Sequence, residues 1–422
     1  MSPSTMLLAL GIAAAAYMAW NIGANDVANA MGTSVGSGAL TLAGAVVLAG
    51  IFEFAGATLV GGHVTETIRK GILETAMFET GGDLFGPDGP QVLMMGMVAS
   101  LLAAGLWLQI ATSFGLPVST THSIIGALVG FALLVAGTAA VSWGMIAKVA
   151  ASWVLSPVLG GLVAAAMFMA VSKGILQRDD PVAATRDLGP HLVALVVFLL
   201  VVSFVYKALG NVLQDPPWWA VMLAAMAAAG AGWAIVKALL ARRRDLPGDR
   251  EGFDWVESVF GRLQIATACY VAFAHGANDV ANAVGPVAAV VQIHDLGTLP
   301  AQVPVPMWIL MLGGAGIILG LATLGYKVIA TVGSSITELT PTRGFSAEFG
   351  AATTVLIASR LGLPVSTTHT LVGAVVGVGM ARGIAALNVR VILRIVNSWI
   401  VTLPAAGVFA ALLYLALEAI FL

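Results

Sequence analysis

The sequence predicts an all-α integral membrane protein that is built from two copies of one unit. The chain has 422 residues, of which 59% are hydrophobic and 9% are charged, whereas soluble globular proteins carry charge on about 25% of their residues. The segment Gly23–Ala30, with the sequence GANDVANA, returns letter for letter as Gly276–Ala283. The segment contains a carboxylate and two amides within an apolar stretch. Such a pattern is too specific to recur only because the two regions have a similar composition, so we infer a duplication.

Apolar stretches that are long enough to cross a hydrocarbon core of about 30 Å follow one another along the whole chain. Proline and glycine interrupt several of them, and Pro117 and Pro364 each divide two neighbouring stretches. A proline lacks the N–H group that a helix interior needs, so we expect broken or re-entrant half-helices. We count about twelve stretches, at 6–31, 40–62, 92–114, 117–137, 145–172, 191–209, 217–240, 263–290, 304–330, 346–361, 364–384 and 391–421.

Lysine and arginine indicate how the spans are oriented. They concentrate in loops after odd-numbered stretches, and such loops face the cytoplasm in membrane proteins. The most polar stretch, 241–262, is therefore expected to be a cytoplasmic linker, with both termini outside. We divide the chain into a first repeat at 1–172, a connecting region at 173–262 with spans at about 191–240, and a second repeat at 263–422.

The GANDVANA segment supplies polar side chains where lipid offers no partners. Its two asparagines are four residues apart and share a helix face, with the aspartate beside them. Carboxylate and amide oxygens suit a hard cation such as sodium, although asparagines also bond neighbouring helices in membranes. The candidate cation ligands are Asp26, Asn29, Asp279 and Asn282, with Asn25 and Asn278 in the same segments, and the two aspartates are the expected Na+ sites.

A second motif, Gly115–Ser123 (GLPVSTTHS), recurs as Gly362–Thr370 (GLPVSTTHT). Its proline ends one segment, so its serine and threonines fall at the N-terminus of the next, where backbone N–H groups lack partners. A positive helix end with three hydroxyls favours an anion, and ordinary capping of the helix by the hydroxyls is the alternative. The candidate anion ligands are Ser119, Thr120, Thr121, Ser366, Thr367 and Thr368.

Glycines follow each hydroxyl motif at a spacing that lets helices approach closely in lipid. They are Gly126 and Gly130 after the first copy, and Gly373 and Gly377 after the second. We therefore expect a tight helix contact behind each candidate anion site.

The two motifs have opposite charge requirements. Two aspartates would repel a multiply charged anion, and charges about 4 Å apart interact by roughly 4 kcal/mol at an effective dielectric constant near 20. Cations bound between the aspartates and the anion remove this conflict, so that anion binding depends on cation binding, as symport requires. Protons on the aspartates would do the same, so sodium and proton coupling both stay open.

Weaker signals remain. His122 and His369 lie inside the hydroxyl motifs, and His275 precedes the second GANDVANA segment, without zinc-ligand spacing. We expect these histidines to serve polar packing, with proton coupling as the alternative. A faint similarity also links 64–72 with 328–336, and the acidic residue of 64–72 is expected to pair with its basic neighbours at the membrane surface.

Composition and missing motifs argue against other functions. The net charge is -2 and no basic stripe interleaves with aromatic residues, so we expect no nucleic-acid partner. The lone Cys269 excludes a disulfide framework. We find no glycine-rich phosphate loop with a lysine and no nucleophile with a paired base, so we predict neither an enzyme nor a bound cofactor.

The paired GANDVANA and PVSTTH motifs resemble those of the inorganic phosphate transporter family, the PiT type, over most of the chain. The resemblance implies a sodium- or proton-coupled phosphate symporter with two inverted-topology repeats, a central site made by both repeats, and a homodimer. It also implies that the hydroxyls and some amides hold phosphate, which adds Asn25 and Asn278 to the substrate ligands. The aspartates and the other amides would hold the cations.

We therefore predict a multi-pass secondary transporter of the cell's inner (plasma) membrane. It would import inorganic phosphate together with sodium, by alternating access around a midplane site. A proton-coupled phosphate or sulfate permease is the alternative that the motifs leave open. A passive anion channel is the competing class, and it would line a pore with repeated carbonyls or charge rings instead of a finite site.

Overall fold

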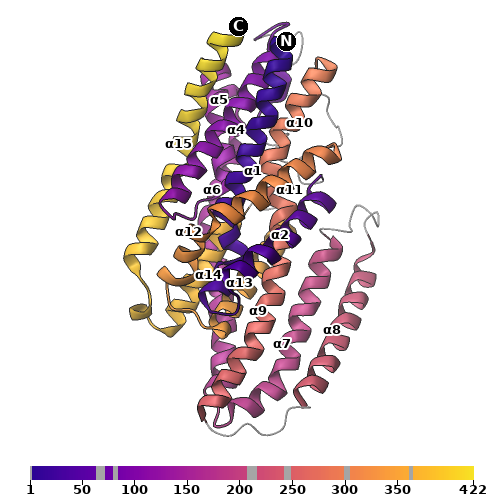
Figure 1. The fold of residues 1–422 in the computed structure, drawn as a ribbon, viewed down its shortest axis with the longest axis vertical. Coiled ribbons are helices and arrows are strands. Elements are labelled where there is room, and N and C mark those ends of the chain that lie inside the picture. The colour runs from indigo at the N-terminus through magenta and orange to yellow at the C-terminus, as the bar shows by residue number, and fades with distance from the viewer. Residues whose placement is uncertain are drawn as a thin grey trace.

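The structure, a computed structural model, describes residues 2–62, 72–78, 84–206, 216–241, 249–298, 305–360 and 365–422. Within these ranges the chain is helical (Figure 1), and extended segments meet only in an isolated bridge between Leu73 and Val141. The predicted all-α class is confirmed. Nearly all of the 64–72 similarity, and residues 242–248 of the expected linker, lie outside the described residues.

The first half contributes five long helices. Ser2 caps α1 by accepting a hydrogen bond from the N–H group of Thr5 (3.2 Å), and Pro3 occupies the first turn, where a helix needs no N–H partner. The helices are α1 (Pro3–Gly36), α2 (Leu42–Leu59), α4 (Gly89–Ser113), α5 (Thr120–Ala136) and α6 (Trp143–Val171).

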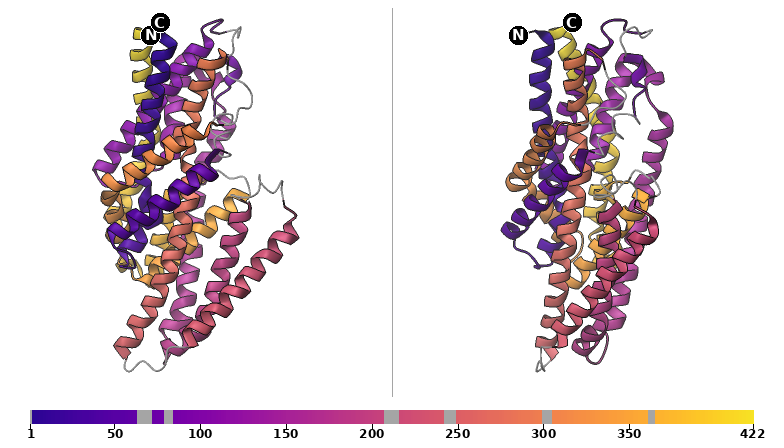
Figure 2. Two further views of the ribbon diagram at one scale, coloured as in Figure 1. Left: turned by 45° about the vertical axis from the view of Figure 1, so that its right-hand side comes forward. Right: turned by 90° about the vertical axis from the view of Figure 1, so that its right-hand side faces the viewer.

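The second half repeats this series after a helical hairpin, α7 (Pro181–Phe204) and α8 (Trp218–Ala241). The hairpin packs through α7 against α9, and α8 lies at the margin of the molecule (Figure 2). The helices of the second half are α9 (Asp249–Asp279), α10 (Ala281–Leu296), α11 (Met307–Thr323), α12 (Gly325–Ala330), α13 (Pro341–Arg360), α14 (Thr367–Arg382) and α15 (Val389–Phe421).

Eight of the described helices are long and apolar enough to cross a membrane. A ninth span results if α11 is joined to the segment Gly325–Ser335, which bends away from it by 60°. The chain is therefore a multi-pass membrane protein, with fewer full-length spans among its described residues than the twelve or so apolar stretches suggested. The bent pair is a broken helix of the kind that the glycine and proline interruptions predicted.

Two of the sequence stretches do not coincide with the helices of the structure. The stretch 263–290 is not one helix, because α9 ends at Asp279 and α10 begins at Ala281. The expected linker is shorter than 241–262, because α9 already begins at Asp249. The charged residues of this stretch led us to expect a linker, but a helix that extends beyond the lipid also carries polar side chains.

The two halves enter the centre of the molecule from opposite ends. α1 begins at the end that carries both termini, whereas α9 begins at the other end (Figure 1). Each then crosses a helix of the other half, α1 against α11 and α9 against α2. A Cβ atom at Gly23 would lie 1.9 Å from the carbonyl oxygen of Ile317, and one at Gly276 would lie 2.1 Å from that of Glu53. Only glycine permits these two related crossings.

The paired glycines behind the hydroxyl motifs make the close contacts that their spacing predicted. A Cβ atom at Gly130 of α5 would lie 2.2 Å from the carbonyl oxygen of Gly407 in α15. One at Gly377 of α14 would lie 2.1 Å from that of Gly161 in α6. Both contacts again join one half to the other, so the halves exchange helices on both sides of the centre.

Candidate functional site

The two GANDVANA segments meet in the interior but differ in backbone conformation. In the first copy α1 runs unbroken through Asn25, Asp26 and Asn29. In the second copy the helix is interrupted: α9 ends at Asp279, and Asn282 already belongs to α10. The six Asn and Asp side chains are buried, except for Asn278, which is partly exposed.

Asp26 lies at the centre of the cluster and accepts hydrogen bonds from both hydroxyl motifs. Its Oδ2 accepts from the hydroxyl of Thr120 (2.7 Å), and its Oδ1 accepts from Thr368 Oγ1 (3.2 Å) and Asn29 Nδ2 (3.0 Å). Thr120 begins α5 and Thr368 lies in the first turn of α14. Two helix N-termini from different halves therefore converge on one carboxylate.

Asn29 and Asn282, the second asparagine of each segment, each reach the hydroxyl motif of the other copy. Asn29 Nδ2 donates to Thr368 Oγ1 at 2.8 Å. Asn282 Nδ2 lies 3.3 Å from Thr120 Oγ1 and 3.2 Å from Thr121 Oγ1. The site is thus completed only when both halves are in place.

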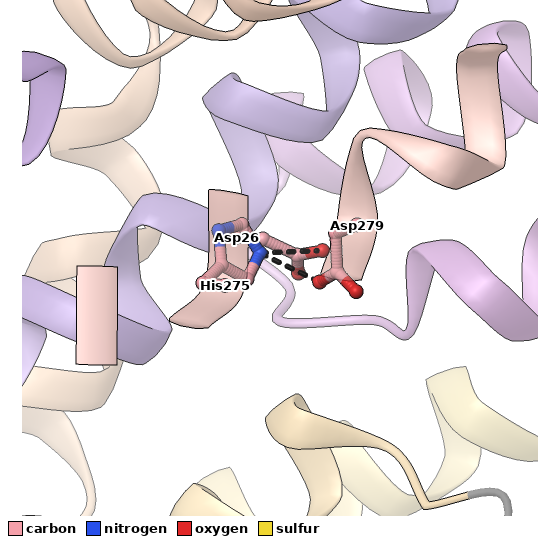
Figure 3. A group of neighbouring side chains, drawn as sticks. All are labelled: Asp26, His275 and Asp279. Atoms are coloured by element: carbon pink, nitrogen blue, oxygen red, sulfur yellow. Dashed lines mark ion pairs between the residues drawn. The ribbon is translucent and has the colours of Figure 1, made fainter. Parts of the chain in front are cut away.

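The second aspartate contacts a histidine that also faces the first (Figure 3). His275 Nε2 lies 2.7 Å from Asp279 Oδ2 and 3.6 Å from Asp26 Oδ2. One ligand atom from each of the three residues falls within 4.8 Å of the others, close enough to hold one metal ion. Asn278 Nδ2 donates to Asp279 Oδ1 at 2.6 Å. Sequence reasoning assigned His275 to polar packing and did not place it between the aspartates.

The serines of the hydroxyl motifs act as helix caps. Ser119 Oγ accepts from the N–H group of His122, and Ser366 Oγ accepts from that of His369, both at 3.2 Å. The serine oxygens therefore cap their helices, which was the alternative interpretation of this motif. The hydroxyls of Thr120, Thr121 and Thr368 point to the site instead.

Asn25 holds a loop. Its Nδ2 donates to Thr112 Oγ1 (2.9 Å) and to the carbonyl oxygen of Leu116 (3.0 Å), while its Oδ1 accepts from the N–H group of Val118 (3.0 Å). Both amide hydrogens are in use, so Asn25 would donate to a bound anion only by giving up one of these bonds.

Comparison with known proteins identifies the family. The model of the Phosphate transporter family matches residues 22–410. The chain belongs to this family. A Pyrococcus furiosus protein named as a phosphate permease is 49% identical over 95% of this chain and 93% of its own. The Arabidopsis thaliana protein named chloroplastic inorganic phosphate transporter 2-1 is 45% identical over 94% of this chain and 70% of its own.

A solved structure has the same fold. It is titled the sodium-dependent phosphate transporter, is 43% identical, and superimposes with a TM-score of 0.87 over 98% of this chain and 100% of its own. The family consists of transporters, so the prediction that this chain is not an enzyme is confirmed.

Two buried glutamates of this transporter were missed by the sequence reasoning. Glu53 of α2 is fully buried, and its Oε1 lies 3.2 Å from His275 Nδ1 on the side away from the aspartates. A single charged residue inside the apolar stretch 40–62 was a signal, because an unpaired charge is costly in lipid. It went unused because its partner comes from the other half.

Glu348 of α13 is the second missed glutamate. It is fully buried and accepts hydrogen bonds from four side chains of α1 and α9. These are Thr33 at 2.6 Å, Ser34 at 2.8 Å, Gln264 at 3.2 Å and Thr267 at 2.5 Å.

Proposed function

We propose that this transporter imports inorganic phosphate in symport with sodium, by alternating access around the site described above. The observation that supports this most strongly is the convergence of both hydroxyl motifs and both aspartates on one buried cluster. Chemistry for an anion and chemistry for a cation occur there side by side, and each needs residues from both halves.

The anion would bind at the N-termini of α5 and α14. Backbone N–H groups and hydroxyls at a helix start favour an oxyanion, and the positive end of the helix dipole adds to the attraction. Two such ends that face one point suit the several oxygens of phosphate. The proposed substrate ligands are Ser119, Thr120, Thr121, Ser366, Thr367, Thr368, Asn25 and Asn278.

Sodium would bind at the two aspartates. Their carboxylates and the amide oxygens of the neighbouring asparagines are hard oxygen ligands, which suit Na+ better than a soft metal. The bound cations would cancel the repulsion between the aspartates and phosphate, so phosphate would bind tightly only when sodium is present. The proposed cation ligands are Asp26, Asn29, Asp279 and Asn282.

The solved relative supports this proposal. Its title names both sodium and phosphate, and it shares 43% of its residues and the fold with this chain. We extend the same cargo to this chain, and we also propose a homodimer in the inner plasma membrane. The bilayer would surround exposed apolar side chains such as Trp218 and Leu223 of α8, which are 71% and 56% exposed.

Uptake of labelled phosphate into proteoliposomes tests the proposal. Inward sodium, inward proton and no gradient would be compared, with sulfate as competitor. We expect accumulation that needs sodium and ignores sulfate. Accumulation that is driven only by protons would assign the aspartates to proton carriage, competition by sulfate would widen the substrate class, and leakage without any gradient would indicate a channel.

A further inference from the structure

The loop that precedes α5 is held by side chains from both halves. Asn25 of α1 accepts a hydrogen bond from the N–H group of Val118 and donates one to the carbonyl oxygen of Leu116. From the other half, the indole N–H group of Trp399 in α15 donates to the carbonyl oxygen of Pro117 at 2.9 Å. The backbone that leads into Thr120 and Thr121 is therefore fixed on two sides.

The same indole also lies against the second hydroxyl motif. Its ring stacks on His369, with centroids 3.8 Å apart and an angle of 19° between the planes. His369 directly follows Thr368, which contacts Asp26. Trp399 thus touches the backbone of the first motif by a hydrogen bond and the histidine of the second motif by stacking.

The corresponding tryptophan beside the first motif makes a different contact. Trp153 of α6 lies 5.1 Å from the ring of His122 at an angle of 53°. Its indole N–H group is buried and has no hydrogen-bond partner among the residues that the structure describes. His122 and His369 meet edge to face at 4.8 Å, so the four rings form one continuous row across the two halves. Of the two indoles, only that of Trp399 is bonded to a loop of the site.

We propose that Trp399 is a positioning residue for anion binding. By bonding the Pro117 carbonyl and stacking on His369, it fixes the spacing of the two sets of threonine hydroxyls that close on Asp26. This inference rests on the proposed function, because it names what sets the geometry of the same anion site. An anion that bridges two helix N-termini loses affinity when either end moves.

Replacing the indole by a benzene ring separates the two contacts. In Trp399→Phe the ring still stacks on His369, but the buried Pro117 carbonyl loses its donor. A buried acceptor without a partner costs enough that we expect KM for phosphate to rise about five- to tenfold, with Vmax within about twofold of the parent. The matched control is Trp153→Phe, which removes an N–H group without a hydrogen-bond partner in the described ranges and should leave both constants within about twofold.

Initial rates of sodium-driven phosphate uptake into proteoliposomes, measured over a range of phosphate concentrations, give both constants. Stabilisation of the detergent-solubilised protein by phosphate against heat gives a second readout that does not depend on turnover. The inference is overturned if the two tryptophan variants behave alike, or if Trp399→Phe lowers Vmax at unchanged KM.

A second pair of variants covers the possibility that Trp399→Phe does not fold. His369→Leu removes the stacking and should raise KM for phosphate. His369→Phe keeps a flat ring and should raise it less, because both variants lack the ring nitrogens and only the flat ring that stacks on Trp399 distinguishes them. Equal KM values for His369→Leu and His369→Phe would show that stacking on Trp399 does not position the site. A parent protein that takes up no phosphate would refute the proposed function and this inference with it, whereas normal parent uptake with a silent Trp399→Phe would refute the positioning role alone.

Discussion

At the scale of single residues, the carboxylate of Asp26 is contacted by side chains from both halves of the chain. Asp26 contacts Thr120 from its own half, and Thr368 and His275 from the other half. A charge buried among apolar helices is retained only where it has partners or carries cargo. This makes Asp26 the residue at which cation and anion binding would be coupled.

Replacing Asp26 by asparagine should abolish the sodium dependence of phosphate uptake. The amide keeps the size of the side chain but loses the charge that would bind sodium, and coupling energies of about 1–3 kcal/mol correspond to about 5- to 150-fold in affinity. Uptake at saturating and zero sodium would be compared. Asp295→Asn, at the exposed end of α10, is the control. An Asp26→Asn protein with undiminished sodium stimulation would rule out the cation role.

Thr368 and Thr370 provide a matched pair for the anion role. Thr368 donates to Asp26, whereas Thr370 donates to the carbonyl oxygen of Ser366 within its own helix. Thr368→Val should raise KM for phosphate about five- to tenfold because a site hydroxyl is lost. Thr370→Val should leave it near the parent value. Kinetics of uptake decide between them, and identical effects would point to a general packing defect.

At the scale of elements, identical sequence takes two backbone forms. GANDVANA lies inside the continuous helix α1, yet its second copy contains the break between α9 and α10. The eight letters are the same, so the difference comes from the residues that flank them, such as Pro286 after the second copy, and from the helices around them. In both copies the first glycine allows a helix of the other half to cross within contact of the backbone.

Those crossings should not tolerate a methyl group. In Gly276→Ala the new Cβ atom would meet backbone of α2, which cannot rotate away as a side chain can. We expect loss of the folded, monodisperse protein or a large fall in its melting temperature. Gly230→Ala in α8 is the control, because a Cβ atom there meets nothing within 4 Å. A Gly276→Ala protein as stable as the control would show that α2 and α9 can separate without cost.

At the scale of the whole molecule, the halves exchange helices. α5 packs on α15, α14 packs on α6, α1 packs on α11, and α9 packs on α2. Neither half can bury its own small-residue faces alone. The duplication therefore yields one interlocked unit in which the site is a product of assembly.

This interlocking predicts complementation between fragments. Residues 1–241 and 242–422 should each be unstable when expressed alone, and should restore sodium-driven phosphate uptake when expressed together. Size-exclusion chromatography and uptake measurements would check this. A stable, monodisperse half would contradict the exchange of helices.

The sequence by itself determined the membrane class, the duplication and the residues of the two motif pairs. The apolar composition shows that much of the chain must avoid water. The exact repeat of polar residues within apolar stretches is visible in the sequence alone. The close approach at Gly130 and Gly377 also followed from spacing alone, because the helix repeat places both glycines of each pair on one face.

Only the tertiary structure decided which groups meet. Glu53, Glu348 and Trp399 each have at least one partner in the other half of the chain, and no periodicity links positions so far apart. Asn25 belongs to the same motif as Asp26, but its amide bonds the loop before α5. The sequence did not show this, because the loop lies about 90 residues away along the chain. Polar side chains in lipid must find partners, and only the folding of one half against the other determined which partners those are.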